Sequence, residues 1–83
     1  MYTLYILQCA DNTLYTGITT DITRRLQEHN ASGKGAAYTS GRRPVQLVYQ
    51  TAYANRSAAQ KAEAAIKKLS RQKKLALIAE NFL

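Results

Sequence analysis

Two tyrosines near the start of the chain, Tyr5 and Tyr15, are the first residues whose type and spacing could do chemistry. A free phenol has a pKa of about 10, so it is a weak base at neutral pH. It can assist a reaction if a nearby cation favours the phenolate, or if the phenol positions a water molecule. The alternative is that both tyrosines are packing aromatics, which is common for tyrosines in strands.

Three further residues, Arg25, His29 and Glu63, add groups suited to a phosphate ester. Arg25 and His29 are four residues apart and would share one face of a helix. A guanidinium can hold two phosphate oxygens and stabilise charge that grows in a transition state. Glu63 is the one acid of a lysine-rich helix, and a single carboxylate with waters and substrate phosphates can hold Mg²⁺. The alternatives are an exposed helix charge, a histidine without a role, and a Glu63–Lys67 ion pair.

The two tyrosines must be positioned by a hairpin. Residues 2–9 and 14–19 have the composition of strands, with a turn signal between them. A two-residue loop would place the tyrosines on opposite faces, whereas a three-residue loop pairs Leu7 with Tyr15 and Tyr5 with Gly17. We predict the three-residue loop, Ala10-Asp11-Asn12, because Asn12 tolerates the positive φ that often ends such loops. Both phenols then share a face, and the opposite face collects the core residues Leu4, Ile6, Leu14 and Ile18.

The rest of the chain predicts one more strand and three helices. We expect a helix from Thr20, as N-cap, to Asn30, then a strand over 45–53 and helices over 56–69 and 71–81. The strand alternates, with Val45, Leu47 and Tyr49 on one face. The apolar stripes of the last two helices are Ala58, Ala62, Ala65, Ile66 and Leu69, then Leu75, Ile78 and Phe82. The fold class is therefore α/β (α+β): a three-stranded antiparallel sheet flanked by three helices, order ββαβαα, in one domain over residues 1–83.

Charge and composition limit which binding partners and which cellular compartment are expected. Twelve Lys and Arg against five Asp and Glu give a net charge of +7 and a pI near 9.9. This balance favours a phosphate polymer or an anionic surface, the alternative being a basic surface without a partner. Cys9 is the only cysteine, which excludes an internal disulfide and a cysteine-cluster zinc site. Without a signal-peptide pattern or a membrane-length apolar stretch, we expect a cytoplasmic protein, and a monomer.

Basic residues outside the chemical set are candidates for binding. Residues 31–44 form a long, glycine-containing loop, and loops of this length are often functional. Its candidates for nucleic-acid contact are Lys34, Tyr38, Arg42 and Arg43. Lys67 belongs to a second basic cluster, with Lys68, Arg71, Lys73 and Lys74, for which a solvated surface is the simpler explanation. Contacts to phosphates would make binding sensitive to salt and almost independent of base sequence.

The spacing of these parts resembles the GIY-YIG nuclease superfamily. Thr3-Leu4-Tyr5 and Tyr15-Thr16-Gly17 resemble the two elements that name the family, and the resemblance continues through Arg24-Arg25-Leu26 and Glu28-His29-Asn30. It ends with Glu63 and the lysines that follow it, so it spans nearly the whole chain. Leu4 and Thr16 stand where the family has isoleucine. Ile18 stands where relatives of the excision-repair endonuclease place a lysine, which removes one activating charge.

The resemblance implies a small, stand-alone endonuclease related to the excision-repair type. It implies catalytic roles for Tyr5, Tyr15, Arg25, His29 and Glu63, and Mg²⁺ or Mn²⁺ bound at Glu63. It also implies that Gly17, which leaves space beside Tyr5, contacts the nucleic acid. Tyr5 would activate water, Arg25 would bind phosphate, and His29 would donate to the leaving oxygen or orient a phosphate. The expected substrate is nucleic acid, DNA rather than RNA, cut by structure or without specificity, in repair or recombination. Targeting would come from DNA shape or from a partner protein.

Two other functions remain open at this point. The first is a nucleic-acid-binding protein that keeps the scaffold without useful turnover, a reading motivated by Ile18. The second is a basic module that binds an acidic protein.

Overall fold

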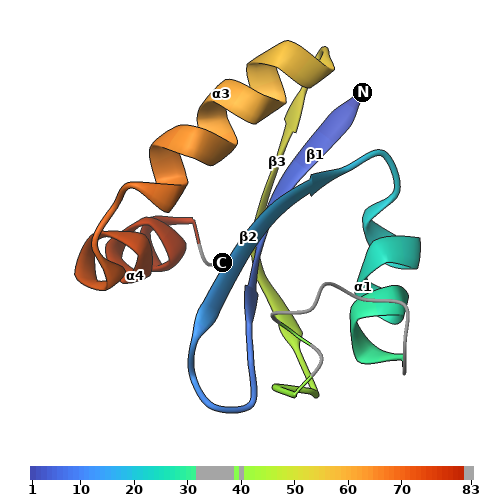
Figure 1. Cartoon of the computed structure of the whole chain (residues 1–83). Coiled ribbons are helices and arrows are strands. Elements are labelled where there is room, and N and C mark those ends of the chain that lie inside the picture. The colour runs from blue at the N-terminus through green and yellow to red at the C-terminus, as the bar shows by residue number, and fades with distance from the viewer. Residues whose placement is uncertain (32–38, 40, 82–83) are drawn as a thin grey trace.

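The computed structural model describes residues 1–31, 39 and 41–81, and it confirms the predicted order of elements. Residues 32–38, 40 and 82–83 lie outside the description, and with them the predicted contacts of Lys34, Tyr38 and Phe82. Figure 1 shows the arrangement. Its elements are β1 (Tyr2–Gln8), β2 (Leu14–Thr19), α1 (Ile22–Asn30), β3 (Gln46–Tyr53), α3 (Arg56–Lys67) and α4 (Arg71–Glu80).

The β1–β2 hairpin has the predicted three-residue loop. Tyr5 lies opposite Gly17 and Leu7 lies opposite Tyr15. The Cys9 N–H donates to the Thr13 carbonyl at 2.9 Å, which closes the loop. Asn12 has φ of 67°, in the left-handed region that asparagine accepts more readily than most residues. The register therefore places Tyr5, Tyr15 and Gly17 on one face of the sheet.

Three layers are built around the central strand β1. The sheet order is β2-β1-β3 with antiparallel pairing throughout. One face packs against α1 through a cluster of Tyr5, Leu7, Cys9 and Val45 with the partly buried Ile22 and Leu26. The other face packs Leu4 and Ile6 against α3 and α4, chiefly through Ile66, Ala62 and Ile78. Figure 1 shows α1 on one side of the sheet and α3 with α4 on the other.

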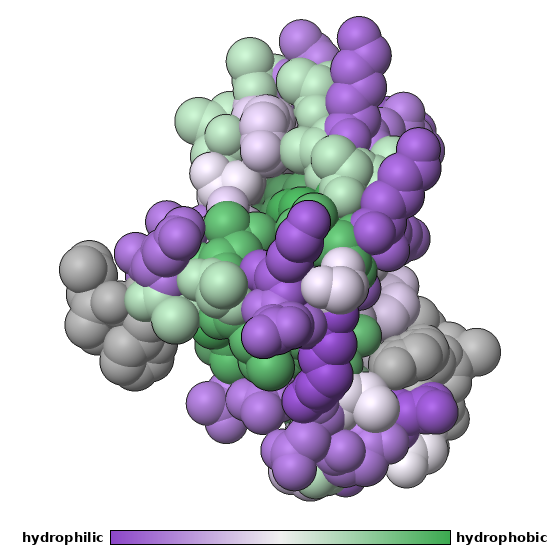
Figure 2. Space-filling model, turned by 90° about the vertical axis from the view of Figure 1, so that its left-hand side faces the viewer, coloured by the Kyte–Doolittle hydropathy of each residue, from purple (hydrophilic) through white to green (hydrophobic). Residues whose placement is uncertain are grey.

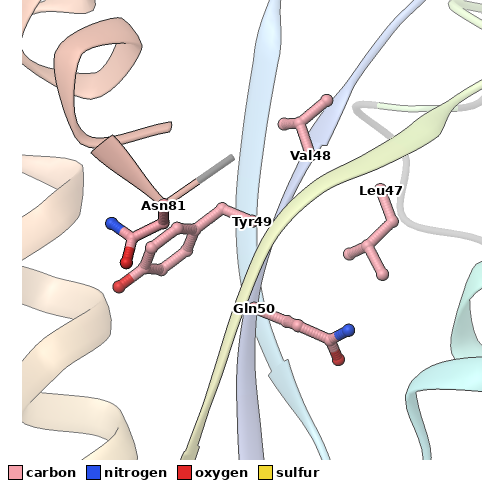
Figure 3. A pocket seen from close by; sticks show the side chains of 5 residues that line it. All are labelled: Leu47, Val48, Tyr49, Gln50 and Asn81. Atoms are coloured by element: carbon pink, nitrogen blue, oxygen red, sulfur yellow. The ribbon is translucent and has the colours of Figure 1, made fainter. Parts of the chain in front are cut away.

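Strand β3 contains a bulge that breaks the predicted alternation. Ile6 pairs with Tyr49, but Leu7 pairs with Leu47, so Val48 is an extra residue in β3. The prediction that Leu47 and Tyr49 share a face is therefore wrong. Leu47 packs with the α1 cluster, whereas Val48 and Tyr49 pack with the α3 and α4 cluster. Figure 3 shows Tyr49 directed toward Asn81 at the end of α4, with Leu47 and Gln50 on the opposite side of the strand.

The helix caps correct one predicted boundary. The N-cap of α1 is Asp21, whose side chain accepts from the Arg24 N–H at 3.0 Å, and not Thr20. Thr19 takes part as well, since its hydroxyl oxygen accepts from the Asp21 N–H at 3.1 Å. The cap moves by one residue because β2 continues to Thr19 and the turn is completed by the Thr19 side chain.

The inward faces of α3 and α4 also differ in part from the predicted stripes. In α3, Ile66 is buried as expected, but Ala65 is exposed and Ala59 is fully buried in its place. In α4, Ile78 packs inward as expected, whereas Leu75 is 41% exposed and Leu77 joins the cluster instead. Apolar residues occur on every side of α4, so periodicity alone does not select its buried face. Among the described residues, no helix has the length and apolar character needed to cross a membrane.

Candidate functional site

The site is built first on β1 and β2, where Tyr5 lies across Gly17. Tyr5 is 1% exposed and its ring centroid lies 6.4 Å from that of Tyr15. A methyl group added at Gly17 would come within 2.6 Å of the Tyr5 hydroxyl oxygen and 3.3 Å of Tyr15 Cε2. Only glycine leaves room for both rings at this point. Gly17 therefore sets the position of the two phenols, as the hairpin register predicts.

A buried chain of polar groups leads from Tyr5 into α1. The Tyr5 hydroxyl lies 3.0 Å from Nε2 of His29, and Nδ1 of His29 lies 2.9 Å from the hydroxyl of Thr39. His29 is 1% exposed and Thr39 is 0% exposed. A neutral imidazole donates from one nitrogen and accepts at the other. When Thr39 accepts from Nδ1, Nε2 is free to accept the Tyr5 proton.

The rings of Tyr5, Tyr15 and His29 form a compact aromatic cluster. The His29 ring centroid lies 5.9 Å from that of Tyr5 and 5.2 Å from that of Tyr15. Both contacts are inclined, at 67° and 59°, which suits the charge distribution of aromatic rings. The predicted diagonal pair of tyrosines is thus completed by a histidine that reaches the sheet from α1.

Arg25 is placed beside the same phenol. Its Nη1 donates to Glu28 Oε1 at 3.0 Å, and the guanidinium lies close enough to the Tyr5 hydroxyl to lower the pKa of the phenol. Arg24, one residue earlier, is the exposed arginine, with its Nε 3.9 Å from Glu28 Oε2. The helix thus presents Arg25 and His29 to the sheet face that carries Tyr5.

Burial and neighbouring charges set the protonation of the site. Desolvation raises the pKa of Tyr5 above its ordinary value, and Tyr15 and Glu63 add to the rise, while Arg25 opposes it. Desolvation also lowers the pKa of His29, as does nearby Arg25, with Glu28 acting in the opposite direction. At neutral pH, Tyr5 is therefore a phenol and His29 a neutral imidazole. Both shifts favour this neutral pair, in which the Tyr5 hydroxyl can donate a hydrogen bond to His29 Nε2, over a phenolate and an imidazolium.

Glu63 reaches the site from α3, which contacts both β1 and β2. Its charge is close enough to Tyr5 to raise the pKa of the phenol. The Glu63 side chain is 21% exposed, and its Oε2 lies 3.2 Å from Nζ of Lys67, so the ion pair that was the alternative to a metal-binding role is formed. In the described part of the chain, no three His, Cys, Asp or Glu side chains gather to hold a metal.

The sequence of this chain matches the family model of the GIY-YIG catalytic domain over residues 1–76. The chain belongs to the GIY-YIG family. Among curated proteins it is similar to UPF0213 proteins of several organisms. It is 60% identical to the one from Desulfotalea psychrophila, over 90% of this chain and 68% of that protein. It is 53% identical to the one from Staphylococcus haemolyticus, over 93% of each.

Solved GIY-YIG relatives have the same fold. The solution structure of a UPF0213 protein from Bacillus halodurans is 46% identical, with a TM-score of 0.64, over 99% of this chain and 87% of that one. A second solution structure, of a protein from E. faecalis, is 47% identical with a TM-score of 0.62, over 92% and 81% of the two chains.

The donors at the site fit a divalent cation of the kind that GIY-YIG nucleases typically use. Mg²⁺ is commonly held by one or two carboxylates and completed by waters and substrate phosphates. Glu63 supplies one partly exposed carboxylate, and its present partner is an exposed lysine side chain. Such a donor set suits a metal that binds together with substrate.

The predicted nucleic-acid contacts are spread over several places on the GIY-YIG scaffold. Arg42 Nε donates to Asp11 Oδ2 at 3.1 Å, which ties the arginine to the hairpin loop. Arg43 is half-buried next to it, and Lys67 is paired with Glu63. The structure thus brings Tyr5, Tyr15, Arg25 and His29 together with Glu63 nearby, and it directs Arg42 toward the turn.

Sequence reasoning missed two residues that organise the site. Thr39 was not among the candidates, and nothing in its local sequence marks it as the partner of His29. Asn30 holds the start of the segment leading to β3: its Nδ2 donates to the Val45 carbonyl at 3.1 Å, and its Oδ1 accepts from the Val45 N–H at 2.7 Å. An asparagine at the end of a helix, directly after the candidate His29, was the available signal.

Proposed function

We propose that the protein is a metal-dependent endonuclease that hydrolyses a phosphodiester of nucleic acid. The observation that carries the proposal is the buried chain Tyr5–His29–Thr39 on a GIY-YIG domain, with Arg25 beside the phenol. This arrangement couples a phenol to a base that is neutral at physiological pH. Membership of a nuclease family makes phosphodiester hydrolysis the reaction that these groups serve.

In the proposed mechanism, Tyr5 takes a proton from the attacking water while its own proton passes to His29 Nε2, so that no free phenolate forms in the buried site. The oxygen of that water bonds to phosphorus as the bond to the leaving oxygen breaks, and the leaving oxygen takes a proton from solvent. Arg25 offsets charge on the phosphate oxygens, and Tyr15 supports the phosphate or the water beside it. A divalent cation held by Glu63, Mg²⁺ or Mn²⁺, would supply Lewis-acid stabilisation of the phosphate and leaving oxygen.

The burial of His29 favours this role over donation to the leaving oxygen. Both ring nitrogens already have partners within 3.0 Å, and the side chain is 1% exposed. A substrate oxygen could reach His29 only by displacing Tyr5 or Thr39. Tyr5 is as buried as His29, but Arg25 and the partly exposed Glu63 lie close to its hydroxyl, so we assign the contact with water to Tyr5.

We infer DNA rather than RNA as the substrate, cut by structure or without sequence preference, and a role in repair or recombination. The net charge of +7 supports a phosphate backbone as the partner without adding base recognition. Targeting would come from the shape of the DNA or from a protein partner. The single buried, free Cys9 is consistent with a cytoplasmic location, and we keep one domain and a monomer as working proposals.

The test is cleavage of a labelled panel of single-stranded, duplex, nicked, flapped and branched DNA, together with RNA. Each would be incubated with Mg²⁺, Mn²⁺ or chelator, using wild type, Arg25→Ala, Glu63→Ala and the exposed control Arg24→Ala. Metal-dependent cuts that are lost in the Arg25 and Glu63 variants and kept in the control support the nuclease. Cuts of equal rate in all four proteins would point to a contaminating enzyme and reject it.

A nucleic-acid-binding protein without turnover is the second candidate. Ile18, on β2 beside Gly17, brings no cation to Tyr5 where some relatives carry lysine. Absence of cleavage on every substrate, with salt-sensitive binding unchanged in Glu63→Ala, would favour this function.

A further inference from the structure

Positive charge is concentrated in one short stretch of the chain. Residues 61–74 contain six of the twelve Lys and Arg residues and one of the five acids, Glu63, which is a net +5 of the total +7. The stretch comprises the second half of α3, the α3–α4 junction and the first turn of α4. Figure 2 looks onto this side of the molecule, where hydrophilic side chains project from the surface around apolar ones.

Two of these cations line a hollow against the hairpin. Arg71 and Lys74, three residues apart on α4, border a pocket completed by Thr13 and Leu14 at the start of β2. Lys73 lies between them in sequence but does not line the pocket. Lys74 is half-buried, whereas Arg71 and Lys73 are exposed, so Lys74 is held against the body of the protein.

The charges around this hollow are unbalanced. The first turn of α4 contains no acidic residue, although the positive end of a helix dipole favours acids over bases there. The acid closest in sequence to the pocket is Asp11, which accepts from the Thr13 hydroxyl at 2.6 Å and from Arg42 at 3.1 Å. Arg71 and Lys74 thus repel each other and the helix dipole, and an anion in the pocket would relieve both.

The hollow and the candidate site lie on opposite faces of the sheet, next to each other along its edge strand β2. On β2, Leu14 lines the hollow and the next residue, Tyr15, belongs to the aromatic cluster. On α3, Lys67 pairs with Glu63 and leads toward the junction with α4. A phosphate chain that leaves the site around the β2 edge would reach the side of the sheet on which Arg71 and Lys74 line the hollow.

We propose that Arg71 and Lys74, with Thr13 and Leu14, form a phosphate-binding subsite that holds the nucleic-acid backbone beyond the reacting phosphodiester. The inference rests on the proposed function for its choice of nucleic acid, because it extends the same substrate past the reaction centre. The subsite contacts backbone and not bases, so it contributes affinity and direction without sequence preference.

The test compares two double variants that lose the same amount of charge. Arg71→Ala/Lys74→Ala removes the subsite, and Lys61→Ala/Lys73→Ala removes two exposed cations of the same stretch. The longest extent of the molecule is 30 Å, so a duplex of about 20 base pairs, at roughly 3.4 Å per pair, is longer than the protein. Its dissociation constant would be measured across a salt series without metal, with circular dichroism to check folding.

Affinity falls as salt rises, and the loss of two phosphate contacts should make the slope of log affinity against log salt shallower by about 1.8. Between 50 and 200 mM salt, wild type is then expected to lose about twelve-fold more affinity than the subsite variant. The control variant should keep the wild-type slope. Equal slopes in the two double variants would overturn the subsite. Binding to anionic lipid vesicles would be measured as well, and a subsite variant that loses vesicle binding but keeps duplex binding would also overturn it.

Cleavage separates this proposal from the broader one. If no substrate is cut but the two double variants differ in slope, the subsite stands and the nuclease proposal fails. If wild type cuts DNA and the double variants bind it alike, the nuclease stands and the subsite is rejected.

Discussion

Tyr5 and Tyr15 lie on one face of the sheet but in different surroundings. Tyr5 is buried, contacts His29 and has a raised pKa, whereas Tyr15 is half-buried at the rim of the aromatic cluster. In the proposed mechanism, the hydroxyl of Tyr5 is the group through which His29 acts on water. At the scale of single residues, the roles in the site are therefore set by burial as much as by chemical type.

We expect Tyr5→Phe to lower the cleavage rate by about 10²–10⁴-fold, the usual contribution of a general base. The ring still packs, but the buried Nε2 of His29 loses its partner, so we also expect a destabilisation of about 1–3 kcal/mol. Single-turnover cleavage with saturating enzyme measures the effect on the chemical step. Tyr49→Phe is the matched control, since Tyr49 is a strand tyrosine on the opposite face. Equal rates for the two variants would remove Tyr5 from the mechanism.

His29 makes stability depend on pH in a defined window. Its pKa is lowered from 6.5 in the folded protein by burial and by Arg25, so the unfolded chain binds the proton more readily. The resulting stability is present above about pH 6.5 and is lost as the pH falls toward the folded-state pKa. Asp11, whose pKa is lowered from 3.8, titrates below this window.

The measurement is the thermal midpoint of wild type and His29→Gln from about pH 7 to pH 5. Wild type should lose stability as the pH falls, and the variant should be flatter over the same interval. Parallel curves would mean that His29 accepts a proton in the folded state as easily as in the unfolded state.

Gly17 shows how the hairpin positions the tyrosines at the scale of an element. In Gly17→Ala, the new methyl group would overlap the Tyr5 hydroxyl, and the buried ring has little space to move. We expect a destabilisation of about 1–3 kcal/mol from overpacking, with loss of cleavage. Gly41→Ala is the control, because a methyl group there meets nothing within 4 Å. Equal midpoints in chemical denaturation would show that Tyr5 can move aside.

Thr16, next to Gly17 on the same strand, has a buried hydroxyl whose hydrogen bonding is not satisfied by the described residues. Thr16→Val replaces the hydroxyl by a methyl group of similar size and should stabilise by about 1 kcal/mol. This corresponds to a rise in thermal midpoint of about 4–8 °C for a domain of this size. A fall instead would reveal a bound water or a partner formed in solution.

Individual elements differ in how far sequence predicts them. The hairpin and its register follow from local signals, because Asn12 and the alternating core residues constrain the same few positions. The Val48 bulge does not follow, since it depends on how β3 fits both neighbouring layers. The exposure of Leu75 and the approach of Thr39 to His29 also depend on contacts between distant segments.

At the scale of the whole molecule, the Asn30 side chain helps to hold the α1 layer to the segment before β3. Asn30 exchanges two hydrogen bonds with the backbone of Val45, directly after the buried His29. Asn30→Ala should lose about 1–3 kcal/mol of stability, the sum of two ordinary hydrogen bonds. Asn30→Asp keeps the acceptor for the Val45 N–H but not the donor, and should fall between.

Urea denaturation of the three proteins measures this fastening. We also expect the Asn30→Ala variant to cut DNA more slowly, because His29 and Thr39 belong to the two segments that Asn30 joins. A variant with full activity and reduced stability would separate the fastening from the site.

The bulge at Val48 affects how readily the protein aggregates at high concentration. β3 is an edge strand of eight residues without a charged side chain, a sequence type that invites pairing with the edge of another copy. The extra residue interrupts the regular spacing of N–H and carbonyl groups on that edge and increases the local twist. We therefore expect the bulge to hinder fibrous aggregation. A variant that lacks Val48 should scatter more light than the natural protein in solutions of the same high concentration.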